Sequence, residues 1–283
     1  MDQLRRMLDS LDLKETAAGT YQAPHIEAGR GVVYGGQLIA QSIVAAEREN
    51  PGKRVRAVHM LFSRGVRADQ HADIQVERMH NGRNLASVTV SFCQEGRLCA
   101  RSLVLLDVAE PDLIRHSRPM PVVPEPDPAQ ATASLLAAPE TIIVGNVDIT
   151  DPGVTGAPSL QMWVRFPGAP DAPGISRALL AYPTDGWLIA TALRPHAGFG
   201  QAMAHVEIST GVVSHSLSFE DTFRADEWLL IDLDSVHAAN GRAFGRADVF
   251  TQDGRLVASF SQDALIRAWP EGQSPVGREK TAF

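Results

Sequence analysis

Two stretches of this sequence, Gln94-Glu95-Gly96-Arg97-Leu98 and Gln252-Asp253-Gly254-Arg255-Leu256, are nearly identical and lie 158 residues apart. Other short matches recur in the same order at 156 to 159 residues: His59 with His215, Ala68-Asp69 with Ala225-Asp226, and Asn81-Gly82-Arg83 with Asn240-Gly241-Arg242. Because the spacing is almost constant, chance is a poor explanation. A repeat of this length indicates two duplicated domains, since solenoid repeats run to roughly 20–50 residues.

Each copy begins with a helix signal and continues as a run of strands. In the first copy, Tyr34-Gly35-Gly36-Gln37 opens an amphipathic stretch that ends near Asn50-Pro51. In the second copy, residues 174–180 predict the corresponding helix. The hairpin signals Asn81-Gly82 and Glu95-Gly96 fall between predicted strands. The predicted strands are residues 55–63, 72–79, 84–94, 97–107, 204–219, 227–236, 243–251 and 255–267.

A helix followed by an antiparallel meander predicts an α+β unit in which a curved sheet buries the helix. Between the copies, residues 108–155 contain eight prolines, each of which removes a backbone donor. We expect an extended linker there, with a short helix at residues 129–138, and an amphipathic helix over residues 1–13. The predicted organisation is an N-terminal helical segment (1–19), a first domain (20–107), the linker (108–155), a second domain (156–270) and a disordered tail (271–283).

Composition excludes several classes of protein. The 283 residues carry a net charge of -7, which argues against nucleic-acid binding because that depends on Lys and Arg neutralising phosphates. No apolar run approaches the ~20 residues of a membrane-spanning helix, and no signal peptide is visible, so we expect a cytoplasmic protein. Cys93 and Cys99 are too few for a disulfide framework or a zinc site, and we expect buried, reduced strand residues. Motifs of serine hydrolases, nucleotide-binding proteins and zinc proteases are absent.

Five stretches of the chain carry a resemblance to a known family. They are Val33-Tyr34-Gly35-Gly36-Gln37-Leu38-Ile39-Ala40-Gln41, Arg177-Ala178-Leu179-Leu180-Ala181-Tyr182-Pro183-Thr184-Asp185, Asp226-Glu227-Trp228-Leu229-Leu230, Thr251-Gln252-Asp253-Gly254-Arg255-Leu256-Val257-Ala258-Ser259 and Ser261-Gln262-Asp263-Ala264-Leu265-Ile266-Arg267. Together they resemble the double hotdog acyl-CoA thioesterases of the bacterial thioesterase II type. The resemblance implies a tandem (double) hotdog fold, in which two antiparallel sheets each wrap around a central helix.

The resemblance also implies an activity. Family members hydrolyse fatty acyl-CoA thioesters to free fatty acid and CoA, without a covalent intermediate, in fatty acid metabolism. No metal or other cofactor is implied, because CoA enters only as part of the acyl-CoA substrate. A homodimer or larger homo-oligomer is expected, since association buries sheet edges that would otherwise stay exposed.

The family uses an Asp, a Thr or Ser, and a Gln to hold the attacking water. Asp185 matches the Asp, directly after the second copy's helix, and Gln262 matches the Gln on the last strand. A carboxylate accepts the proton of the water, and an amide orients the water and the developing charge. Without the resemblance, Asp185 would be interpreted as a turn residue and Gln262 as a polar strand residue.

The hydroxyl position departs from the family pattern. Val212 stands where the family has Thr or Ser, and Ser214 replaces the Asp of an Asp-His pair. Strand alternation predicts residues 210, 212 and 214 on one face, with Thr210 and Ser214 each about 7 Å along the strand from Val212. Ser214 is therefore the candidate replacement hydroxyl, with Thr210 or a shifted alignment as alternatives.

Five further residues are candidates for binding the substrate. Gly35, Gly36 and Gln37 open the first helix, where backbone N–H groups favour anions and developing oxyanions, although a tight strand-to-helix turn explains the glycines equally well. His59 begins the first copy's matching strand, and Arg64 follows it, where it could meet CoA phosphates.

Two other functions stay open from the sequence. Because Val212 cannot bind water, the chain could be a weakly active or non-catalytic acyl-CoA-binding protein. A hotdog enoyl-CoA hydratase is the third hypothesis, although neither predicted helix resembles the Asp-x-x-x-x-His pattern of those enzymes.

Overall fold

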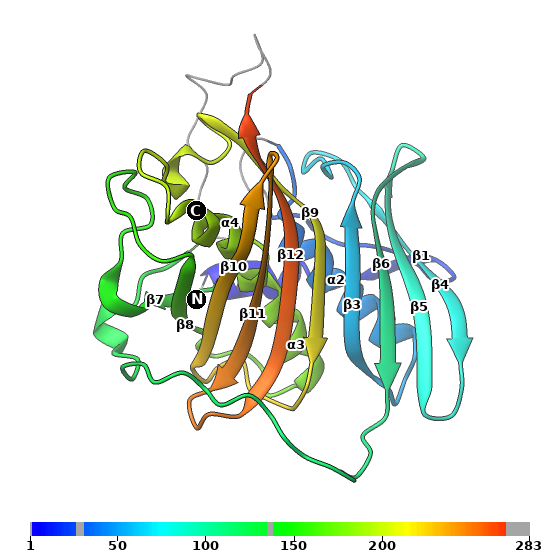
Figure 1. The fold of residues 1–283 in the computed structure, drawn as a ribbon. Coiled ribbons are helices and arrows are strands. Elements are labelled where there is room, and N and C mark those ends of the chain that lie inside the picture. The colour runs from blue at the N-terminus through cyan, green and yellow to red at the C-terminus, as the bar shows by residue number, and fades with distance from the viewer. Residues whose placement is uncertain (1, 27–30, 135–137, 270–283) are drawn as a thin grey trace.

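The computed structural model describes residues 2–26, 31–134 and 138–269, whose arrangement Figure 1 shows. The predicted tail at 271–283 lies outside these residues. The helices are α1 (Asp2–Asp9), α2 (Gly35–Glu49), α3 (Pro173–Thr184) and α4 (Trp187–Leu193), with 3-10 turns η1 (Pro128–Gln130), η2 (Val144–Asn146) and η3 (Gln201–Met203). The strands are β1 (Lys14–Ala17), β2 (Thr20–Gln22), β3 (Arg54–Phe62), β4 (Asp73–Asn81), β5 (Leu85–Gln94), β6 (Arg97–Asp107), β7 (Glu140–Ile143), β8 (Ser159–Arg165), β9 (Ile208–Phe219), β10 (Leu229–Ala239), β11 (Arg242–Thr251) and β12 (Leu256–Ala268).

In the described part of the chain, the strands form a single 12-stranded sheet in the order β1-β2-β4-β5-β6-β3-β9-β12-β11-β10-β8-β7. The two halves meet edge to edge where β3 pairs with β9, from Ala57 opposite Ser218 to Leu61 opposite Ser214. The helices lie on one side of this sheet (Figure 1). The predicted α+β architecture, with an antiparallel meander after a buried helix in each copy, is confirmed, and the two predicted sheets are joined into one.

The long helices of the two halves pack against each other and run antiparallel. Near the C-terminus of α2, Glu47 Oε1 accepts a hydrogen bond at 2.7 Å from the Arg177 guanidinium, which lies near the N-terminus of α3. At the other end, Gly36 of α2 lies against Tyr182 of α3. Both helices are apolar around most of their circumference, as burial between a sheet and a second helix requires. Within the described residues, no helix combines the length and the apolar character needed to cross a membrane.

The helix of the second half is interrupted, which the sequence pattern did not predict. The pattern predicted one helix near residues 174–180, whereas α3 ends at Thr184 and a second helix, α4, begins at Trp187. Pro183 has no N–H to donate to the preceding turn, so the helical hydrogen bonding weakens there. The interruption leaves Asp185 and Gly186 between two helix ends.

The eight predicted strands are confirmed to within a few residues, and Cys93 and Cys99 are free thiols on two of them. Cys99 is buried as expected, but the expected burial of Cys93 is wrong: it is half-buried, because its neighbours Phe92 and Gln94 take the buried face of β5. Four strands were not predicted: β1, β2, β7 and β8. The helix expected at residues 129–138 is wrong, although residues 135–137 lie outside the description. Only η1 forms there, because Thr132 and Thr141 exchange two backbone hydrogen bonds of 2.9 Å and hold the segment extended.

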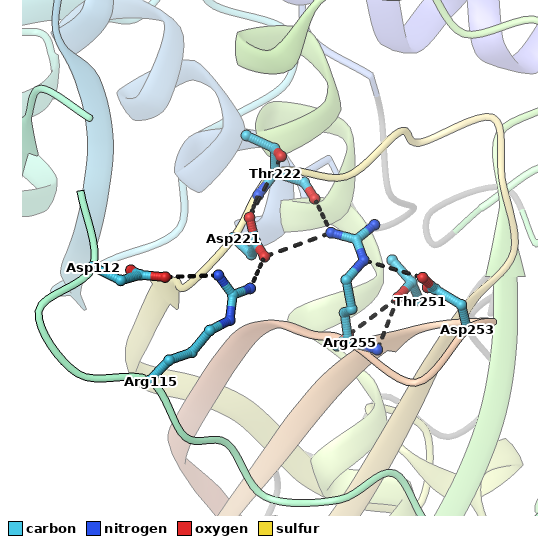
Figure 2. Close-up of polar contacts among 7 residues, drawn as sticks. All are labelled: Asp112, Arg115, Asp221, Thr222, Thr251, Asp253 and Arg255. Atoms are coloured by element: carbon cyan, nitrogen blue, oxygen red, sulfur yellow. Dashed lines mark hydrogen bonds and ion pairs between the residues drawn. The ribbon is translucent and has the colours of Figure 1, made fainter. Parts of the chain in front are cut away.

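The linker crosses the outer face of the second half's sheet. Met120 and Val123 pack against an apolar cluster that includes Trp163 and Trp228. Polar contacts fix its course: Figure 2 shows Arg115 between Asp112 and Asp221, and Arg255 reaching Asp221 from the β11–β12 turn. These ion pairs are exposed and contribute little each, so the apolar packing supplies most of the stabilisation.

Candidate active site

Asp185 lies at the junction of three helix ends. It is the C-cap residue of α3 and precedes α4. Its Oδ2 accepts a hydrogen bond of 3.0 Å from the N–H of Gly36, in the first turn of α2 and 149 residues earlier in the chain. The two glycines are needed for this approach. A Cβ on Gly35 would lie 2.6 Å from Asp185 Oδ2, and one on Gly36 would lie 2.9 Å from the Ala181 carbonyl.

The environment of the Asp185 carboxyl suits proton transfer near neutral pH. Burial raises its pKa from 3.8 to about 7, and the backbone N–H groups of Gly36 and Gly35 offset part of that shift. Its side chain is 4% exposed, and Oδ1 has no hydrogen-bond partner among the described residues. One carboxylate oxygen is thus fixed while the other can accept a proton. Burial, and in second place the Asp185 charge, raises the pKa of the adjacent Tyr34 well above its ordinary value.

Asp185 lines a cavity of about 450 Å³, a size typical of small-ligand sites. Both halves of the molecule contribute to it. Its walls are built from residues 32–35, 38 and 62–66 of the first half and residues 185–186, 189, 201, 205, 210–213 and 265 of the second. The site therefore lies between the copies.

A β-bulge decides which hydroxyl reaches this cavity. In β9, Ser214 pairs with Asp263 and Val212 with Ala264, so Val213 is an extra residue. The expectation that residues 210, 212 and 214 share a face is therefore wrong for Ser214. Its hydroxyl lies 3.4 Å from Asp263 Oδ2, and Ser214 is not part of the cavity wall.

Thr210 and Val212 stay on the same face after the bulge, and both line the cavity. Val212 packs against the apolar cluster of α4 that contains Ile189 and Leu193. Thr210 is 8% exposed, and its Oγ1 has no hydrogen-bond partner within the described part of the chain. Of the two hydroxyl candidates, Thr210 is the one that the structure brings to the Asp185 cavity.

Gln262 lies on the same face of β12 as Ala264, two residues before it and therefore farther from the cavity. It is not part of the cavity wall. It stands opposite His215, and both side chains are 1% exposed. Burial lowers the pKa of His215 to about 4, and the Gln262 amide offsets part of this shift. No hydrogen bond of regular geometry joins the two side chains, so the polar atoms of Gln262 lack partners in the described structure.

The remaining predicted residues fall in different places. Gly35 lines the cavity, but the N–H of Gly36 is directed to Asp185. The Gln37 side chain is buried and bonds to the backbone of Pro24 and Ile26.

The two basic candidates are separated by the sheet. His59 is exposed on the outer face, where Nδ1 lies 3.0 Å from the Ser216 hydroxyl, away from the cavity. Arg64 is exposed at the cavity wall, and its guanidinium has no salt-bridge partner among the described residues. Neighbouring arginines of β3 are paired instead, Arg54 with Asp107 and Arg56 with Glu220.

Sequence analysis missed several polar residues of the cavity wall. Tyr34, Gln201 and His205 join Asp185 there; Gln201 begins η3, and His205 lies in the turn that follows it. Only Tyr34 had a sequence signal, its place directly before the glycine pair.

Comparison with known proteins decides the family. A model of the acyl-CoA thioesterase N-terminal domain matches residues 24–106, and one of the acyl-CoA thioesterase C-terminal domain matches residues 117–266. The chain belongs to the acyl-CoA thioesterase family. This membership confirms the resemblance inferred from the sequence.

Relatives of this thioesterase family match over nearly their whole length. Acyl-CoA thioesterase 2 of Haemophilus influenzae is 28% identical, over 94% of this chain and 98% of the relative. Human acyl-coenzyme A thioesterase 8 is 25% identical, over 92% and 88%. The crystal structure of an acyl-CoA thioesterase II from Mycobacterium marinum superposes with a TM-score of 0.78 at 29% identity, over 95% and 99% of the chains. The double hotdog fold is therefore shared over 95% of the chain.

Proposed function

We propose that this thioesterase hydrolyses acyl-CoA by means of a water molecule activated by Asp185. The observation that carries the proposal is the Asp185 carboxyl itself. It is buried at the wall of the cavity with a pKa of about 7; Gly36 fixes one oxygen, and the other has no hydrogen-bond partner among the described residues. A general base is most effective when its pKa lies near the working pH.

The reaction uses one proton transfer in each direction. Asp185 Oδ1 takes a proton from water as the water oxygen attacks the thioester carbonyl carbon. The resulting oxyanion collapses and the carbon–sulfur bond breaks. The CoA thiolate then receives the proton from Asp185, leaving a free carboxylic acid, CoA and the regenerated carboxylate.

We assign Thr210 and Gln262 to orienting water and stabilising the oxyanion. Thr210 lines the cavity, and its hydroxyl has no hydrogen-bond partner in the described part of the chain, which supports a direct role. Gln262 is buried two residue pairs beyond Val212 and Ala264, and its amide has no hydrogen-bond partner among the described residues. Its assignment is supported by the family resemblance. The N–H of Gly36 acts on the base rather than on the substrate, because it already donates to Asp185.

Arg64 supports the proposed direction of substrate entry. It is an exposed cation at the first-half wall of the cavity and carries no ion pair within the described chain. CoA brings phosphate groups, which Arg binds through charge-assisted hydrogen bonds. We therefore place the CoA end of the substrate at Arg64 and the thioester at Asp185.

Thiol release from acyl-CoA tests the proposal. We expect turnover by the wild-type protein and a loss of roughly 10²–10⁴ in kcat for Asp185→Asn, the usual contribution of a general base. Binding of acyl-CoA without thiol release would instead support a non-catalytic binding protein. Loss of enoyl-CoA absorbance without thiol release would support a hydratase. Wild-type turnover that is unchanged in Asp185→Asn would overturn the assignment of the base.

Self-association remains a prediction. The outer face of the first half exposes Leu61, Leu103 and Leu105, which are 64%, 50% and 40% exposed. Sedimentation velocity of the wild-type chain and of Leu103→Glu tests it. A wild-type oligomer that dissociates in the variant supports association through this face, and a monomeric wild-type chain contradicts it.

A further inference from the structure

A second cavity, of about 190 Å³, lies behind the reacting end of the first. The two cavities share Tyr34, Gly186 and Gln201 as wall residues, and Gly186 directly follows Asp185. The remaining wall comes from Trp187 of α4 and from the segment between the halves: residues 132–134, 141, 143 and 149–150.

This second cavity is a built site rather than a gap between loops. The Gln201 N–H donates to the Ile149 carbonyl at 2.8 Å, which ties the segment after α4 to the segment between the halves. The two backbones approach so closely that a Cβ on Gly200 would lie 2.5 Å from the Thr150 carbonyl. Two backbone hydrogen bonds between Thr132 and Thr141 fix the opposite wall.

Charge and polarity indicate what the cavity accepts. No Lys or Arg lines it among the described residues, whereas Arg64 lines the first cavity. The phosphate-bearing end of the substrate therefore fits the first cavity, and the acyl group extends past Gly186 into the second. Ile143, Ile149 and Trp187 give that wall an apolar character.

Two polar atoms in the wall distinguish this cavity from a plain hydrocarbon pocket. Thr141 is 2% exposed and Gln201 is 7% exposed, and neither Thr141 Oγ1 nor Gln201 Oε1 has a hydrogen-bond partner in the described structure. An alkyl chain would leave both atoms unsatisfied, which is costly for buried polar groups. A hydroxyl group on the acyl chain could donate to Gln201 Oε1 or pair with Thr141 Oγ1.

We propose that the second cavity is the acyl subsite and that Thr141 and Gln201 make it selective for acyl groups carrying a hydroxyl. The proposal rests on the proposed thioesterase function, because it takes the thioester to lie at Asp185. Thr141 and Gln201 are specificity-determining residues, distinct from the groups that activate water.

The test compares kcat/KM for hexanoyl-CoA with that for its 3-hydroxy and 5-hydroxy derivatives. We expect a preference of roughly three- to tenfold for at least one hydroxy substrate, the contribution of a single neutral hydrogen bond. Thr141→Val keeps the side-chain volume and should reduce that preference to about one, and Thr141→Ser should restore it. Gln201→Leu is the second variant and should also reduce it.

Thr132→Val is the matched control. Thr132 lines the same cavity, but its hydroxyl already bonds to the Thr141 carbonyl, so the preference should persist. Equal kcat/KM for all three substrates, or a preference unchanged in both Thr141→Val and Gln201→Leu, would overturn the subsite.

A binding measurement separates this outcome from failure of the proposed function. Titration of Asp185→Asn with the same three CoA esters should show the same preference in Kd. If the wild-type protein releases no thiol but the Kd preference and its loss in Thr141→Val hold, the subsite stands and the proposed hydrolysis fails. If the wild-type protein releases thiol but shows no preference in kcat/KM or Kd, the proposed hydrolysis stands and the subsite fails.

Discussion

The two helices that the repeat makes equivalent end in different ways. In the first half, α2 ends at Asn50, whose Nδ2 donates to the Ala46 carbonyl at 2.8 Å and so caps its own helix. In the second half, α3 ends at Asp185, whose carboxylate leaves its own helix and reaches Gly36 of the other half. The C-terminal end of the helix therefore serves stability in one copy and supplies the proposed base in the other.

The outer faces of the halves differ in a related way. The linker covers the second half through Met120 and Val123, whereas leucines of the first half remain exposed. The second half thus holds the proposed base and is held in place by the linker, which also contributes to the second cavity. In the proposed site, the base, the hydroxyl and the amide all come from the second copy, and the glycine pair comes from the first.

The largest expected effect separates the two helix ends. Asp185→Asn should lower kcat by roughly 10²–10⁴, because a general base is lost. Asn50→Ala should leave kcat unchanged and reduce the free energy of unfolding by about 1 kcal/mol, since it removes one buried hydrogen bond. Thiol-release kinetics and urea denaturation of both variants check this. A comparable loss of kcat in Asn50→Ala would remove the functional difference between the two positions.

The second prediction concerns the bulge in β9. Thr210→Val should lower kcat by roughly 10²-fold, because one oxyanion or water contact is removed, and Thr210→Ser should retain most activity. Ser214→Ala should have a much smaller effect, since the bulge turns Ser214 toward Asp263. Steady-state kinetics of the three variants distinguish the hydroxyls. A larger loss of kcat in Ser214→Ala than in Thr210→Val would show that Ser214, and not Thr210, supplies the hydroxyl.

The third prediction uses two buried groups of the second half whose effects on stability have opposite signs. The pKa of folded Asp185 is raised to about 7, so between 3.8 and 7 the folded chain binds a proton that the unfolded chain lacks. Stability therefore falls as pH rises through this range, by about 4 kcal/mol for this group. Asp185→Asn should unfold at higher temperature than wild type at pH 8, and much less so at pH 4.

His215 acts in the other direction. Its folded pKa is lowered to about 4 from 6.5, so below 6.5 the unfolded chain binds the extra proton and stability falls as pH falls, by about 3 kcal/mol. His215→Gln should flatten the loss of stability between pH 6.5 and 4, whereas His59→Gln, at an exposed position on the outer face of β3, should keep it. Thermal unfolding across this pH range measures both. An unaltered acid profile in His215→Gln would contradict the assignment.

The smallest expected effect concerns the contact between the halves. Gly36→Ala places a Cβ against the backbone at Ala181 and Tyr182, which cannot move easily, and should cost about 1–3 kcal/mol of stability. Gly174→Ala, on the other helix, meets only the end of the flexible Glu47 side chain and should cost less. Urea denaturation compares the two. Equal losses would mean that the close crossing at Gly36 is not specially constrained.

The sequence by itself determined the duplication, the eight long strands and the glycine pair that opens α2, because hydrophobic periodicity, turn residues and short repeated motifs can be recognised along the chain. It also indicated Asp185 and Gln262, through the family resemblance. Strands β1, β2, β7 and β8 escaped prediction because short segments take their conformation from the neighbours with which they pair.

Only the tertiary structure decided how the site is assembled. The hydrogen bond between Gly36 and Asp185 spans 149 residues, and no local pattern reports such a contact. The prediction from alternation along β9 was wrong for Ser214. One extra residue, Val213, moves the side chains of the residues that follow it to the opposite face of the strand. The sequence therefore determined which side chains were available, and the pairing of the strands and helices decided which of them meet.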